Sequence, residues 1–131
     1  MARILIVDDE EMERVMERSM LEGLGHTLMF ASDGDVALKV YQKEEVDLVI
    51  TDLAMPELNG LRLIQEIMEF DSDARIIAVS GASADQLDLA EDMGAICTLF
   101  KPVDYEEFLA AVTEALKDQD SPKDPWGHVP I

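Results

Sequence analysis

Arg3-Ile4-Leu5-Ile6-Val7-Asp8-Asp9, near the start of this 131-residue sequence, joins four consecutive aliphatic residues to two carboxylates. An apolar run this uniform predicts a strand buried on both faces, the kind found in parallel sheets that helices cover on both sides. Similar runs occupy 46–51 and 74–79, and weaker ones occupy 26–31 and 95–100. The sequence therefore predicts five strands.

Segments with helical periodicity separate these runs. One apolar face is formed by Met12, Val15, Met16, Ser19 and Met20, and we expect the methionines mostly to pack in the core. The other helices are predicted over 36–41, 61–68, from Ser83 or Ala84 to Gly94, and from 105 to Lys117 or Asp118. Five alternating strands and helices predict an α/β fold: a doubly wound, five-stranded parallel sheet in the flavodoxin-like order 2-1-3-4-5.

Composition excludes several classes of protein. Ten Lys and Arg stand against 29 Asp and Glu, for a net charge of -19. Direct nucleic-acid binding is disfavoured because contacts with phosphates need basic patches, and anionic membrane surfaces are disfavoured for the same reason. No segment resembles a signal peptide or a transmembrane span. Cys97 is the single cysteine, so we expect no disulfide within the chain and no metal site built from cysteines. We expect a cytoplasmic protein.

The C-terminal segment differs from the rest. We assign residues 1–117 to one domain and 118–131, DQDSPKDPWGHVPI, to a Pro-rich tail, because Pro122 cannot continue a helix. The tail is interpreted as a flexible extension, as a docking peptide anchored by Trp126, or as the start of a linker to an output domain. These alternatives remain open.

Polar residues gather at the ends of the predicted strands. Ligands of open parallel sheets bind at this carboxyl edge. The residues that the pattern places there are Asp8, Asp9, Asp52, Ser80, Gly81, Lys101 and Pro102.

Three neighbouring carboxylates repel one another, and a divalent cation relieves the repulsion. Mg²⁺ favours a few hard oxygen ligands together with waters. We expect Asp9 and Asp52 to bind it directly, Asp8 to bind through water, and the backbone carbonyl of Ala54 to complete the set. The thiolate and imidazole ligands typical of zinc are missing from the cluster.

The same set suits phosphoryl transfer. An Asp carboxylate can act as a nucleophile and form an aspartyl-phosphate. The metal ion, the Lys101 ammonium and the Ser80 hydroxyl would each stabilise one phosphoryl oxygen. Each residue alone has a simpler explanation: Asp8-Asp9 as a helix cap, Ser80-Gly81 as a turn. Their occurrence together at one edge favours the functional interpretation.

The motifs that carry this set resemble the receiver domain of two-component response regulators, the CheY-like family. They are ILIVDDE (4–10), DLVITDLAMPELNG (47–60), IIAVSGASA (76–84) and GAICTLFKPVD (94–104). The likeness extends over about Ala2 to Lys117. Gly60, in the loop before the third helix, also matches the family pattern.

The resemblance implies a role for each residue. Asp52 would accept a phosphoryl group from a histidine kinase. Asp8 and Asp9 would bind Mg²⁺ with Asp52. Lys101 would contact the phosphoryl group and form a cis peptide bond with Pro102, and Ser80 would move to bind a phosphoryl oxygen. In this family the domain catalyses its own phosphorylation and slow dephosphorylation, so it is not a metabolic enzyme.

One position departs from the family. The place in the last strand where the family carries Tyr or Phe holds Thr98. Thr98 cannot make the rotation that this aromatic makes on activation, so the usual switch is altered. We expect Phe100 to be out of phase with that position and unable to replace the aromatic.

The predicted function is a phosphorylation-activated switch, here a stand-alone receiver. Its partners would be a sensor histidine kinase or phosphotransfer protein and a downstream protein that recognises the fourth helix, fifth strand and fifth helix. The alternatives are a receiver cut from a larger regulator or hybrid kinase, a phosphorylation-independent interaction module, and a small-molecule phosphatase. Ala54 disfavours the last, because such enzymes usually carry a second Asp there.

The surface of the fourth and fifth helices is strongly acidic. Its acids are Asp85, Asp88, Glu91, Asp92, Asp104, Glu106, Glu107 and Glu114. The surface is interpreted either as an ordinary solvated face or as a site for a basic partner. A symmetric dimer through it is disfavoured by like-charge repulsion, so we expect a monomer or a weak dimer.

Overall fold

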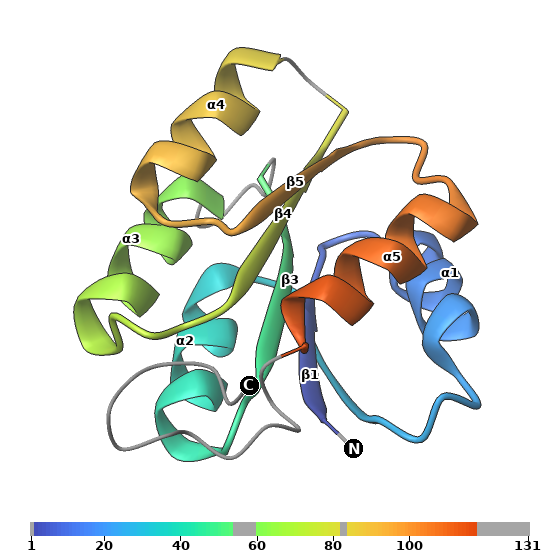
Figure 1. Cartoon of the computed structure of the whole chain (residues 1–131). Helices are drawn as coiled ribbons and strands as arrows, with labels where there is room; N and C mark the ends of the chain where they lie inside the picture. The colour runs from blue at the N-terminus through green and yellow to red at the C-terminus, as the bar shows by residue number, and fades with distance from the viewer. Residues whose placement is uncertain (1, 54–59, 82–83, 118–131) are drawn as a thin grey trace, which may run out of the picture.

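The computed structural model describes residues 2–53, 60–81 and 84–117. Strands and helices alternate along the chain (Figure 1). The strands are β1 (Arg3–Val7), β2 (Thr27–Ala31), β3 (Leu48–Asp52), β4 (Ile76–Ser80) and β5 (Cys97–Phe100). The helices are α1 (Glu11–Leu21), α2 (Gly34–Lys43), α3 (Gly60–Phe70), α4 (Ala84–Met93) and α5 (Tyr105–Ala115).

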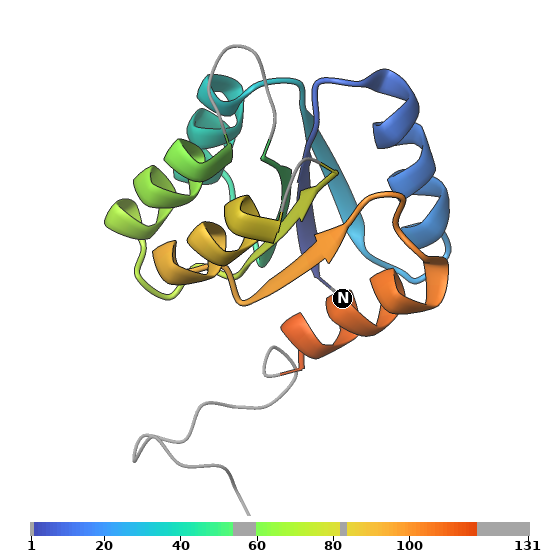
Figure 2. The same ribbon diagram turned by 90° about the horizontal axis from the view of Figure 1, so that it is seen from above.

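All strand pairings are parallel, and the strand order is β2-β1-β3-β4-β5. Helices α1 and α5 cover one face of the sheet and α2, α3 and α4 cover the other, as Figure 2 shows from above. The predicted fold class and strand order are confirmed. The main differences lie at strand ends, where β3 and β4 begin and end later than the apolar runs indicated.

The core consists of two apolar layers, one on each side of the sheet. Successive strand residues point to opposite faces, so Leu5 and Val49 join the layer under α2, α3 and α4, whereas Ile6 and Ile50 join the layer under α1 and α5. Every residue of β3 and β4 is buried. The central strands therefore supply side chains to both layers.

Helix α1 presents a different face to the core from the one expected. Met12 is 77% exposed, and Val15 and Met16 are also exposed, whereas Glu17 and Leu21 are buried. The expected packing was therefore wrong for Met12, Val15 and Met16, whereas Met20 packs against the layer under α1 and α5 as expected. Leu21 belongs to the apolar layer under α1 and α5, and the spacing of four residues brings Glu17 onto the same side of the helix.

Phe100 also differs from its expected orientation. Cys97 and Leu99 pack with the layer under α5. Thr98 and Phe100 lie two residues apart and therefore both point to the α4 side. The expectation that Phe100 is out of phase with Thr98 was wrong, because only adjacent strand residues point to opposite faces.

Within the residues that the structure describes, no helix has both the length and the apolar character needed to cross a membrane. The predicted tail, 118–131, lies outside the described residues.

Candidate functional site

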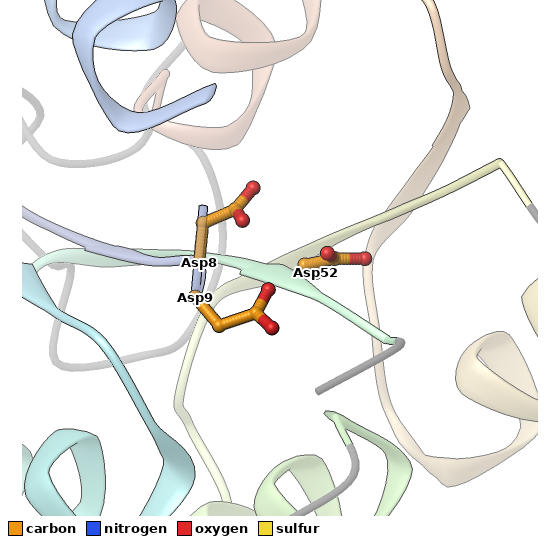
Figure 3. Close-up of side chains that lie close together, drawn as sticks. All are labelled: Asp8, Asp9 and Asp52. Carbon is orange, nitrogen blue, oxygen red and sulfur yellow. The ribbon is translucent and has the colours of Figure 1, made fainter. Parts of the chain in front are cut away.

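Three carboxylates meet at the carboxyl edge of the sheet. Asp8 and Asp9 follow β1, and Asp52 ends β3, which is hydrogen-bonded to β1. Figure 3 shows the three side chains at these strand ends. One ligand atom from each lies within 4.8 Å of the others. Asp8 and Asp52 are 1% and 6% exposed, whereas Asp9 is open to solvent.

Lys101 joins two of these carboxylates. Its Nζ lies 3.3 Å from Asp8 Oδ2 and 3.2 Å from Asp52 Oδ2. Burial lowers the pKa of Lys101, but attraction to Asp52 and Asp8 outweighs that effect, and the net shift is upward. The Lys101-Pro102 peptide bond is cis. The ammonium therefore stays charged between two carboxylates that are largely removed from water.

Several backbone contacts fix Asp8. The Glu10 N–H donates to Asp8 Oδ1 at 2.9 Å, and Arg14 Nη1 donates to the Asp8 carbonyl oxygen at 2.6 Å. Burial raises the pKa of Asp8, opposed by the hydrogen bond from Glu10 and by the charge of Lys101. The N-cap residue of α1 is Glu10, and its side chain makes no capping hydrogen bond. Asp8 is thus oriented toward the cluster rather than serving as a helix N-cap.

Close packing of the backbone holds Asp52 in place. The Thr51 hydroxyl donates to the Asp52 carbonyl oxygen at 2.9 Å, and the Gly60 N–H donates to the Leu53 carbonyl at 3.0 Å. A Cβ on Gly60 would lie 2.6 Å from the Cα of Leu53, closer than packed atoms approach. Glycine at position 60 therefore permits the start of α3 to pass directly against the end of β3.

Ser80 ends β4 at the same edge of the sheet. Its side chain lies on the face that α2, α3 and α4 cover, whereas Asp8 and Asp52 lie on the face that α1 and α5 cover. Ser80 is fully buried, and its carbonyl accepts a hydrogen bond from the Lys101 N–H at 3.0 Å. Its partner in the β4–β5 register is Phe100. Thr98, the other predicted switch residue, is half-buried and pairs with Ala78.

Glu17 also belongs to this environment, although the apolar pattern of α1 predicts a different buried face. It is 4% exposed, and its Oε2 has no hydrogen-bond partner among the described residues. Burial, reinforced by the charge of Asp8, raises the pKa of Glu17 from 4.5 to about 8. The sequence carries one signal for this placement, the spacing of four residues to Leu21, but the methionine-rich face contains more apolar residues and dominates the pattern.

The donor set fits a magnesium ion. Three carboxylates supply hard oxygen atoms, the ligands that Mg²⁺ favours, and two of them are buried with one ammonium between them. The fourth predicted ligand, the carbonyl of Ala54, lies outside the described residues.

Comparisons with known proteins point the same way. The family model described as the response regulator receiver domain matches residues 4–113. The chain is 32% identical to Protein CcdB of Bacillus subtilis over 88% of this chain and 98% of that protein. It is 37% identical to the probable transcriptional regulator ycf27 of Guillardia theta, over 88% of this chain but only 45% of that protein.

A solved structure is also similar. The response regulator protein TrrA of Thermotoga maritima, in complex with Mg(2+)-BeF, superposes with a TM-score of 0.82 at 34% identity. The match covers 88% of this chain and all of that one.

Proposed function

The chain belongs to the response regulator receiver domain family, and from that premise we propose that Asp52 is the residue that accepts the phosphoryl group. The domain is a phosphorylation-activated switch of two-component signalling with Mg²⁺ as its cofactor. The observation that carries the assignment to Asp52 is its pairing with Lys101 at 3.2 Å beside two further carboxylates.

The chemistry follows from this arrangement. An Asp52 carboxylate oxygen forms a bond to phosphorus as the phosphorus–nitrogen bond of the donor phosphohistidine breaks, and the imidazole leaves. When bound, Mg²⁺ would neutralise charge on the carboxylates and on a phosphoryl oxygen, and Asp8, Asp9 and Asp52 would hold it. Lys101 would exchange its contact with Asp52 for a phosphoryl oxygen. Ser80 would donate its hydroxyl to another.

We assign the partners more finely by the same reasoning. Receiver domains interact with histidine kinases and other proteins. For this chain the phosphodonor is a sensor histidine kinase or a phosphotransfer protein in the cytoplasm, and the receiver acts as a monomer or weak dimer. Nucleic acid is disfavoured as a direct partner, since a net charge of -19 opposes contact with phosphates. The domain assignment, 1–117 with a tail at 118–131, is part of this proposal.

Intact-mass measurement tests the phosphoacceptor. Wild-type protein is incubated with Mg²⁺ and a small acyl phosphate, beside Asp52→Asn and a sample containing a chelator. A single hydroxylamine-labile phosphoryl adduct is expected in the wild type and in neither control. An adduct that persists in Asp52→Asn would assign the phosphoryl group to another residue.

The same experiment separates the alternatives. Absence of any adduct on folded, magnesium-loaded protein would favour a phosphorylation-independent interaction module. Rapid release of inorganic phosphate from a small phosphomonoester would favour a phosphatase. A receiver that is part of a larger regulator would give the same result as the proposed switch. The ycf27 regulator is an example of such a larger protein, because this chain matches only 45% of its length.

A further inference from the structure

Strand β2 forms one edge of the sheet, and its outer side is unpaired. Within the part of the chain that the structure describes, β2 is hydrogen-bonded only to β1 (Figure 2). Its sequence, TLMFA over Thr27–Ala31, contains no charged residue and no proline. Natural edge strands usually carry charges, prolines or bulges that prevent them from pairing with another strand. The edge formed by β2 lacks these protective features and is therefore suited to pairing.

The hydrogen bonds of β2 show which of its peptide groups face the open edge. The Thr27 N–H donates to the Ala2 carbonyl at 2.8 Å, in the direction of β1. Alternate residues of a strand turn their peptide groups to the same side. Leu28 and Phe30 alternate with Thr27, so their N–H and C=O groups point away from β1. These groups are available to a further strand.

A shallow hollow lies beside this edge, between β2 and α1. Its lining residues are Glu11, Arg14, Val15, Arg18 and Phe30. Val15 and Phe30 are 48% and 38% exposed. Leu28 lies on the same face of β2 as Phe30 and packs partly against the layer under α1 and α5. The exposed apolar surface at this edge is therefore on the α1 side of the sheet.

The charges that line the hollow are complementary to themselves. Glu11 and Arg18 are exposed and lie about two helical turns apart, with Val15 between them. Neither forms an ion pair with another residue that the structure describes. After a rotation of 180° about the middle of the hollow, Glu11 of one copy meets Arg18 of the other, and the reverse contact forms as well. A symmetric dimer requires a self-complementary surface of this kind.

The same two-fold axis also suits the strand. When the axis passes beside Met29 and is normal to the sheet, Leu28 of one copy stands opposite Phe30 of the other in an antiparallel pair. Opposed residues that turn their peptide groups toward each other exchange both N–H···O bonds. The axis also keeps the two α1 helices on one face, so that Val15 and Phe30 are covered together. Strand pairing and charge pairing therefore require the same symmetry.

We propose that two copies of this chain associate through antiparallel pairing of their β2 strands, which joins the two sheets into one and sets α1 beside α1. The carboxyl edges of the two sheets then point in opposite directions, and both Asp52 sites stay open to a phosphodonor. A net charge of -19 on each chain opposes the contact and makes the dimer weak. This inference goes beyond the proposed function and does not depend on the role of Asp52.

Sedimentation velocity over a range of protein concentrations tests for the dimer and locates it. Wild-type protein should show a monomer–dimer equilibrium, and Phe30→Glu should weaken it by about tenfold or more, because a charge then faces the edge of the other copy. Phe100→Glu is the matched control, since Phe100 is also an exposed phenylalanine on an edge strand. Wild-type protein that stays monomeric throughout overturns the inference, as does a dimer that is lost only in Phe100→Glu.

Charge exchange tests the position of the two-fold axis. Glu11→Arg and Arg18→Glu each bring like charges together, so each should weaken the dimer by about tenfold. An equal mixture of the two variants should restore association, because each is complementary to the other, and the double variant should restore it by itself. Weaker association in Arg18→Glu together with stronger association in Glu11→Arg would show that net charge alone is responsible, and would overturn the inference.

Amide hydrogen exchange identifies the strand that pairs. The amides of Leu28 and Phe30 should become more protected as protein concentration rises. The Thr27 amide is already hydrogen-bonded to β1 and should change little. Protection that rises on β5 and not on β2 would place the contact at the opposite edge and overturn the inference.

Discussion

The layer under α2, α3 and α4 and the layer under α1 and α5 are built on the same sheet, yet they treat charge differently. Among the described residues, the buried carboxyl groups belong to Asp8, Glu17 and Asp52, and they lie on the α1 and α5 side. The buried side chains with polar groups on the other side, Thr51, Ser80 and Tyr41, are uncharged. One layer is an ordinary apolar core, and the other combines a core with a reactive site.

The comparison shows where stability is given up for function. Removing a carboxylate from water is costly unless a cation or hydrogen bonds compensate. Asp8 and Asp52 have Lys101 as a counter-ion, whereas Glu17 Oε2 has no hydrogen-bond partner among the described residues. Stability that depends on pH and on metal should therefore arise mainly in the layer under α1 and α5.

Replacing Glu17 should have the largest effect. Its pKa of about 8 in the folded protein exceeds the ordinary 4.5, so the folded state retains a proton that the unfolded state loses, and stability falls as pH rises through that window. Each pKa unit corresponds to about 1.4 kcal/mol, so the free energy of unfolding should fall by up to roughly 5 kcal/mol across this pH range. Glu17→Gln should abolish this fall. Urea unfolding in chelator at acid, neutral and alkaline pH measures it.

Glu13→Gln is the matched control for this prediction. Glu13 lies one turn earlier on the same side of α1 and is half-buried. The Glu13→Gln variant should keep most of the pH dependence of the free energy of unfolding. Parallel curves for wild type and Glu17→Gln would contradict the raised pKa of Glu17.

Lys101→Met should have the next largest effect on stability. Removal of the lysine leaves Asp8 and Asp52 without their ammonium, and breaking a buried pair typically costs about 3–5 kcal/mol. Mg²⁺ should restore more stability to this variant than it adds to wild type, because the cation replaces the missing charge. Melting temperatures with and without Mg²⁺ measure the effect.

Arg62→Met provides the corresponding surface control. The Arg62–Glu66 contact is 3.0 Å but exposed, and such pairs contribute about 0–1 kcal/mol. If both variants lost the same stability, burial would not be the cause.

Ile64→Ala tests the layer under α2, α3 and α4. Ile64 is fully buried among apolar neighbours, so the substitution should cost about 2–5 kcal/mol through lost burial and a residual cavity. The loss should be the same at neutral and alkaline pH, and Mg²⁺ should not change it. A loss that varied with pH or metal would remove the contrast between the layers.

The smallest expected effect on stability comes from removing helix N-caps, which occur in both layers. Asp33 caps α2 by accepting from the Val36 N–H at 2.9 Å, and Asp104 caps α5 by accepting from the Glu107 N–H at 3.0 Å. Each substitution by Ala should cost about 1 kcal/mol. Unfolding free energies that differ widely between the two variants would show that the layers also differ in local helix stability.

Much of the candidate site could be predicted from the sequence, since it depends on strand ends. Asp8 and Asp52 directly follow apolar runs, and neighbouring parallel strands bring such ends to one edge. The pairing of Lys101 with both carboxylates required the tertiary structure, because Asp8 and Asp52 are 93 and 49 positions away from Lys101 in the sequence. The orientation of Phe100, by contrast, follows from local sequence alone, because the period of two in a strand places it on the same face as Thr98.

The sequence by itself determined the strands, the helices and the residues at the carboxyl edge, because these follow from local periodicity and from the position of a residue after an apolar run. Only the tertiary structure decided which face of α1 is buried. Apolar count favoured the methionine-rich face, but α1 packs through Leu21, and the helical repeat then buries Glu17. A helix can turn only one side to the sheet, and that choice depends on contacts with distant strands that no local pattern contains.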